Sequence, residues 1–191
     1  MSATTLKTAG WLAMISAIIT LPLVYLSFRL EGQSDLTAQL LETTIQVLGI
    51  VIFVAVTILL KRFLNSTFNF HLTDRLIKLM IKANIVICVM AILSLYLKTL
   101  QESLSVFIVV MVVVLGIMQT MFGYQLRRLP NDLGGMLKPY CYLNMAIGIT
   151  SASVVLVPVA VVLSAIADVM LGTIFFQAAR RAAENTAEEP P

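Results

Sequence analysis

The apolar run at residues 140–176 most constrains what this chain can fold into. It is 37 residues long and contains one charged side chain, Asp168. A single helix of that length would measure about 55 Å, whereas the hydrocarbon layer of a bilayer is about 30 Å thick. The run therefore has to fold back on itself, and Pro158 marks the break because proline lacks an N–H and disfavours helical geometry at the preceding residue. We predict one span at residues 140–157 and another at residues 159–177.

Four further apolar stretches have the length of membrane spans: residues 9–28, 38–60, 76–96 and 104–126. With 59% hydrophobic and 12% charged residues, the chain differs from an ordinary soluble domain and from a disordered one. The sequence predicts an all-α, polytopic integral membrane protein, a bundle of six transmembrane helices arranged as three helical hairpins. In this organisation residues 1–8 form a cytoplasmic N-terminus, residues 9–178 the membrane domain and residues 179–191 a disordered cytoplasmic tail.

The basic residues indicate the orientation of the bundle. If the N-terminus is cytoplasmic and the chain crosses six times, eleven of the 13 lysines and arginines fall on the cytoplasmic side. Only Arg29 and Lys98 fall on the other side, which is a strong positive-inside bias. A single crossing at residues 140–176 would weaken the ratio to nine against four. Charge and length therefore predict a multi-pass protein with both ends in the cytoplasm, in a cell membrane of the bacterial inner-membrane type.

The sequence lacks the motifs that mark most catalytic and cofactor sites. It has no glycine-rich phosphate loop, no His-Glu-x-x-His pair and no Cys/His cluster, and His71 is the only histidine. We therefore expect no enzyme activity, no cofactor and no metal site. The basic residues follow the membrane topology rather than forming a groove, so we expect no nucleic-acid binding.

Asp168 is the strongest candidate for a functional residue. It lies nine residues before Gln177, close to the bilayer midplane. There an ionised aspartate costs about 2.5–3.5 kcal/mol unless it is neutral, paired or faces a wet cavity. One hypothesis is that Asp168 binds a cation or proton, or anchors a polar solute, inside the bundle. The alternative is structural, because a neutral Asp168 hydrogen-bonded to Asn144 or to a backbone carbonyl would hold two helices together.

The residues expected to accompany Asp168 are polar side chains between the midplane and the inner leaflet: Asn144, Gln119, Ser164 and Lys82. Lys82 has two interpretations. It lies about 9 Å into its predicted span, so its long stem can carry the ammonium group to the membrane surface. Otherwise it pairs with a group inside the bundle.

Small and polar residues recur every four positions on three predicted helices. Ala9, Ala13 and Ala17 form an alanine stripe on the first helix, and the last two helices carry the sets Tyr140, Asn144, Gly148, Ala152 and Ala160, Ser164, Asp168, Gly172. Such stripes let helices approach closely, since packing rather than hydrophobicity holds helices together in lipid. We expect the last two stripes to pack against each other or to line a shared cavity. The alanine stripe serves either packing within the bundle or docking of another subunit.

Two classes of function follow from these features. The first is a transport-type protein with a solute, cation or proton site around Asp168. The second is a non-enzymatic scaffold or accessory subunit that holds a membrane-protein partner or a second copy of itself. In size, six spans and the spacing of Ala9, Ala13 and Ala17, the chain is similar to the substrate-binding membrane subunits of energy-coupling-factor vitamin importers. That resemblance implies an importer subunit, although the chain contains no substrate motif of that family. For both classes of function we expect the lipid bilayer itself to be a partner of the chain.

Overall fold

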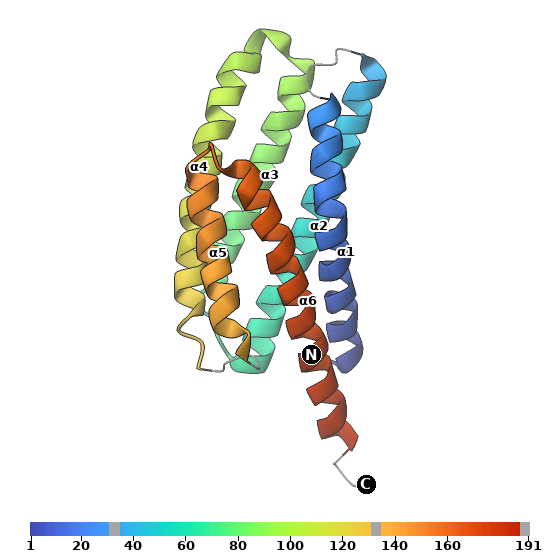
Figure 1. Cartoon of the computed structure of the whole chain (residues 1–191), viewed down its shortest axis with the longest axis vertical. Coiled ribbons are helices and arrows are strands. Elements are labelled where there is room, and N and C mark those ends of the chain that lie inside the picture. Colours follow the sequence, from blue (N-terminus) through green and yellow to red (C-terminus); the bar gives the residue numbers. More distant parts are fainter. Residues whose placement is uncertain (31–34, 131–134, 188–191) are drawn as a thin grey trace.

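The computed structural model of the chain describes residues 1–30, 35–130 and 135–187 (Figure 1). Within these residues all regular structure is helical. The elements are α1 (Ala3–Leu30), α2 (Leu36–Phe68), α3 (Asp74–Tyr96), the short 3-10 helix η1 (Lys98–Leu100), α4 (Gln101–Leu126), α5 (Leu137–Ala152) and α6 (Val157–Ala187). The predicted all-α bundle of six helices is confirmed, and α2 and α6 run past their predicted ends at residues 60 and 177.

Five of the described α-helices, all except α5, are long and apolar enough to cross a membrane. α5 has 16 residues, and at 1.5 Å per residue it is about 24 Å long, less than the thickness of the hydrocarbon layer. In Figure 1 it covers only part of the height of its neighbour α4. The chain is therefore a multi-pass helical membrane protein whose fifth helix is shorter than the span predicted at residues 140–157. The side of the membrane that each end faces remains a prediction.

The six helices form a closed ring. Each helix packs against its neighbours in sequence, and α6 packs against α1 (Figure 1). The most extensive contacts are those of α1 with α6 and of α4 with α5. Within the described residues no two helices approach closely across the ring. The centre of the ring is therefore filled by side chains and by whatever space they leave.

Glycines explain why α4 and α5 pack so closely. A Cβ atom at Gly116 of α4 would lie 2.6 Å from the carbonyl oxygen of Gly148 in α5. A Cβ atom at Gly148 would in turn collide with Thr120 and with the backbone of α4. Only glycine allows this approach of two backbones. Of the two alternatives for the stripes of the last two helices, packing against each other is therefore wrong for Gly148, which packs on α4.

The pairing of α6 with α1 uses small residues in the same way. A Cβ atom at Gly172 of α6 would lie 3.1 Å from the carbonyl oxygen of Gly10 in α1. Ala9 and Ala13 are completely buried and Ala17 is nearly so. The alanine stripe thus lies inside the bundle, which is the first of the two roles expected of it, and Gly172 contacts α1.

The turn between α5 and α6 falls where Pro158 predicted a break. It covers residues 153–156, and α6 begins at Val157. All five N–H groups from residue 153 to residue 157 donate hydrogen bonds, four to carbonyl oxygens and that of Leu156 to the Ser153 hydroxyl. The next residue is proline and has no N–H to satisfy. This turn therefore leaves none of these amides without a partner, as a non-polar environment requires.

The best-packed part of the core lies at the end of the bundle where α1 begins and α6 ends. We call this the basic end, because eleven of the 13 lysines and arginines lie toward it. Phe63 of α2 and Phe175 of α6 are almost completely buried there and pack edge to face, with ring centroids 5.5 Å apart. Leu64, Ile77 and Leu126 are buried with them.

Residues 179–187 are helical, where the sequence predicted a disordered tail. α6 continues to Ala187, and residues 188–191 lie outside the described residues. Alanine-rich sequence favours helix. Arg180 also pairs with Glu184 one turn later, at 2.9 Å. The prediction is corrected for residues 179–187, whose composition is compatible with continued helix.

Candidate solute site

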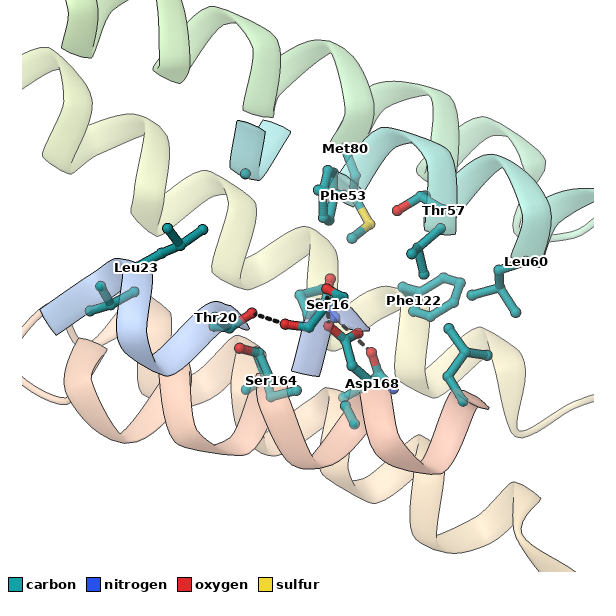
Figure 2. Close-up of a pocket in the computed structure, with 18 of the residues that line it drawn as sticks. Ser16, Thr20, Leu23, Phe53, Thr57, Leu60, Met80, Phe122, Ser164 and Asp168 are labelled. Carbon is teal, nitrogen blue, oxygen red and sulfur yellow. Dashed lines mark hydrogen bonds between the residues drawn. The ribbon is translucent and has the colours of Figure 1, made fainter. Parts of the chain in front are cut away.

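The ring of helices surrounds a partly open cavity of about 400 Å³ to which all six α-helices contribute side chains. Its polar wall comprises Ser16, Thr20, Ser27, Gln46, Thr57, Gln119, Tyr140, Asn144, Ser164 and Asp168. Four of the five residues predicted to form a polar site are therefore in one cavity. Figure 2 shows Ser16, Thr20, Ser164 and Asp168 gathered on its α1 and α6 side.

Asp168 meets a partner that the sequence did not predict. The hydroxyl of Ser16 on α1 donates to Asp168 Oδ2 at 2.6 Å (Figure 2). The close packing of α1 on α6 beside Gly172 brings the two side chains into reach. Asp168 is partly buried and Ser16 is buried. Oδ1 of Asp168 has no hydrogen-bond partner among the described residues.

Two amide side chains form a second polar group in the wall. Gln119 Nε2 on α4 donates to Asn144 Oδ1 on α5 at 2.6 Å. Asn144 Nδ2 donates in turn to the carbonyl oxygen of Tyr140 at 2.8 Å, one turn earlier in α5. Asn144 is only 3% exposed. Its side chain thus links α4 to α5, and these bonds differ from the direct Asp168–Asn144 hydrogen bond of the structural alternative.

Ser164 lies in the cavity wall one turn before Asp168. Its hydroxyl donates to the carbonyl oxygen of Val161 at 2.7 Å, within α6. It therefore presents its oxygen to the cavity without contacting Asp168 through a hydrogen bond.

Lys82 does not belong to the site. Its side chain is exposed and lines a different depression, on the basic end, together with Lys61 and Lys78. It is absent from the wall of the central cavity. Of its two interpretations, the structure agrees with the surface position. The sequence placed Lys82 near Asp168 by depth, whereas its face of α3 points away from the ring.

The rest of the cavity wall is apolar. Phe53 of α2, Met80 of α3 and Phe122 of α4 belong to it, and Figure 2 shows Phe53 and Met80 across the cavity from Asp168. Leu60 and Leu171 line it toward the basic end, where the buried Phe63 and Phe175 lie beyond. Among the described lining residues there is one carboxyl group and no lysine, arginine or histidine.

The sequence does contain a pattern that indicates Ser16 and Thr20 of α1, which the predicted site lacks. Ala9, Ala13, Ser16 and Thr20 are spaced by four, three and four residues, which is the spacing of one helix face. Following the strict four-residue step from Ala13 led to Ala17 and away from Ser16. Gln46 lies in the first turns of α2, where a position at the membrane surface would equally explain a polar residue.

Comparison with models of known protein families finds no match, and comparison with curated proteins and with solved structures finds no significant similarity.

Proposed function

We propose that this chain is a transport-type membrane protein, of the bacterial inner-membrane type, with a solute site centred on Asp168. The observation that carries the proposal is the cavity of about 400 Å³ inside the ring, which brings Asp168, Ser16, Asn144 and Gln119 into one wall. Its volume falls within the range of about 300–1,000 Å³ typical of small-molecule sites. A partly open cavity between membrane helices, lined by a carboxyl group, is a place where a small solute or cation can bind in the membrane.

The position of Asp168 favours a binding role over a purely structural one. Ionisable residues inside membrane bundles are costly and typically mark substrate or ion pathways. The only side chain that donates a hydrogen bond to Asp168 among the described residues is Ser16. A serine or threonine pair would link α1 to α6 without the cost of a carboxyl group. The carboxyl group is explained if it contacts a ligand.

The scaffold and importer-subunit alternatives have less support. Both used the alanine stripe of α1 as a surface for a membrane partner. Ala9 and Ala13 are completely buried inside the bundle, so they do not offer that surface. Ser16 and Asp168 are the hydroxyl and the carboxyl group in contact in the cavity, and this pair alone does not lead us to propose an enzyme.

The test replaces Asp168 by asparagine in cells where loss of this protein causes a growth or uptake defect. Asp168→Asn keeps the shape and an oxygen that can accept from Ser16, so we expect normal abundance in the membrane and loss of complementation. The matched control is Asp74→Asn at the basic end, where Asp74 accepts from Asn65 at 3.0 Å outside the cavity. We expect that variant to complement. Full complementation by Asp168→Asn would contradict the proposal.

A further inference from the structure

The class of ligand can be inferred from which hydrogen-bonding groups the cavity wall leaves free, and this inference rests on the proposed solute site. Three hydroxyls on α1 and α6 flank or contact Asp168, and each already donates to a protein oxygen. Ser16 donates to Asp168, Thr20 to the carbonyl oxygen of Ser16 at 2.7 Å, and Ser164 to that of Val161. Their protons are committed, while their oxygens can still accept.

One amide of the wall also leaves an acceptor without a partner. The nitrogens of Gln119 and Asn144 donate to protein oxygens. Gln46 Oε1 is buried and has no hydrogen-bond partner among the described residues, although Gln46 lines the cavity. Together with Asp168 Oδ1, it leaves two strong acceptors that a ligand can satisfy. A buried acceptor without a partner is costly, so a ligand that donates hydrogen bonds gains most here.

The charge of the wall points to a cation. Asp168 is its only carboxyl group, and no described lining residue is basic. The aromatic rings of Phe53 and Phe122 also line the cavity, and the face of such a ring attracts cations. An anion would meet repulsion from Asp168.

The apolar part of the wall indicates an organic ion rather than a metal ion. A bare alkali or alkaline-earth ion needs about six oxygen ligands around it. Within the described residues no group of three or more His, Cys, Asp or Glu side chains could hold a metal ion. Much of the wall is hydrocarbon, including Met80 and Leu60. A ligand with an apolar body fits both the volume and this surface.

We infer that the cavity binds a small organic ammonium ion with an apolar body. Its N–H groups donate to Asp168 Oδ1 and to the neighbouring amide oxygens, and its hydrocarbon part lies against Phe53, Phe122 and Met80. The positive charge of the ligand offsets the cost of a carboxylate at this depth in the membrane.

Three probes of similar shape and different charge test this assignment: benzylammonium, benzyl alcohol and benzoate. The purified full chain is reconstituted in lipid nanodiscs, and binding of radiolabelled benzylammonium is measured by equilibrium dialysis with each unlabelled compound as competitor. We expect saturable binding of benzylammonium, competition by benzyl alcohol at concentrations at least about tenfold higher, and no competition by benzoate. This comparison uses the unaltered chain and does not depend on the folding of a variant.

Variants then assign the binding to Asp168. We expect Asp168→Asn to weaken benzylammonium binding about tenfold and Asp74→Asn to leave it unchanged. If benzyl alcohol or benzoate competes as well as benzylammonium, the ammonium assignment is overturned while a solute cavity is retained. Absence of saturable benzylammonium binding overturns the assignment as well. The proposed function fails separately, if Asp168→Asn complements fully in cells.

Discussion

The basic end and the cavity region of this bundle are built from the same six helices but from different side chains. At the basic end, Phe63 and Phe175 meet edge to face and are 1% and 0% exposed. In the cavity region the helices present hydroxyls, amides and one carboxyl group to a space of about 400 Å³. The largest fully buried side chains are thus concentrated at one end, and the polar side chains line the other region.

The largest effect should come from the closest helix contact, and it shows that the cavity region is not loosely packed everywhere. Gly148→Val places a branched side chain against Thr120 and the backbone of α4, where even a Cβ atom collides. We expect most of the protein to be lost from the monodisperse peak in gel filtration in mild detergent. Gly49→Ala is the control, because a Cβ atom there meets nothing within 4 Å. A well-folded Gly148→Val variant would show that α4 and α5 lie farther apart.

The next largest effect is expected when phenylalanine is replaced by alanine at the basic end, and the same substitution in the cavity wall should cost less. Phe63→Ala removes a ring that contacts Phe68 and Phe175, with centroids 5.4 and 5.5 Å away, and we expect it to cost about 3 kcal/mol or more. Phe53→Ala removes a partly exposed ring from the cavity wall and should cost less than half as much. Unfolding curves in detergent with increasing sodium dodecyl sulfate measure both. Equal costs would contradict the division of the bundle into two regions.

A smaller effect is expected for the partner of Asp168. Ser16→Ala removes the hydroxyl that donates to Asp168 at 2.6 Å, and we expect a loss of about 1 kcal/mol in the free energy of unfolding. Ser105→Ala serves as control, since its hydroxyl only bonds the carbonyl oxygen of Glu102 on an exposed part of α4. The same unfolding assay applies. A cost no larger than that of Ser105→Ala would mean that Ser16 and Asp168 are not in contact.

The smallest effect is expected at the α5–α6 turn, which lies beside neither the aromatic core nor the carboxyl group of Asp168. Val154 has φ +59°, a conformation that branched side chains adopt at a cost of about 1–2 kcal/mol. Val154→Gly relieves this strain but loses apolar surface and gains chain entropy in the unfolded state, so we expect a net gain below about 1 kcal/mol. A slightly higher midpoint in thermal melts would agree. A clear loss of stability would show that Val154 is not left-handed.

Local features of the sequence predicted the helices well. Length and Pro158 placed the last hairpin, because a membrane fixes how long an apolar helix can be and proline stops it from continuing. Depth along the helix brought Asp168, Asn144, Gln119 and Ser164 into one set, which the cavity confirms as neighbours. These predictions need only distances along one helix.

The sequence does not predict which helices pack against each other around the ring. Pairing of α1 with α6 joins the two ends of the chain, and nothing in the spacing of one helix specifies which distant helix it contacts. For that reason the predicted site lacks Ser16, and the contact of Gly172 with α1 is not predicted. Lys82 keeps two interpretations in the sequence for a related reason, because its depth can be estimated but the direction of its side chain around α3 cannot.

The central claim is tested most directly by measuring which face of α6 is accessible to water. In a background with Cys88 and Cys141 replaced, single cysteines are placed at Ser164, in the cavity wall, and at Ile166, which is exposed on the outside of the bundle. In lipid nanodiscs a small hydrophilic thiol reagent should label Ser164→Cys and leave Ile166→Cys unlabelled, because lipid covers the outer face. Labelling of Ile166→Cys with a protected Ser164→Cys would contradict a hydrated cavity inside the ring.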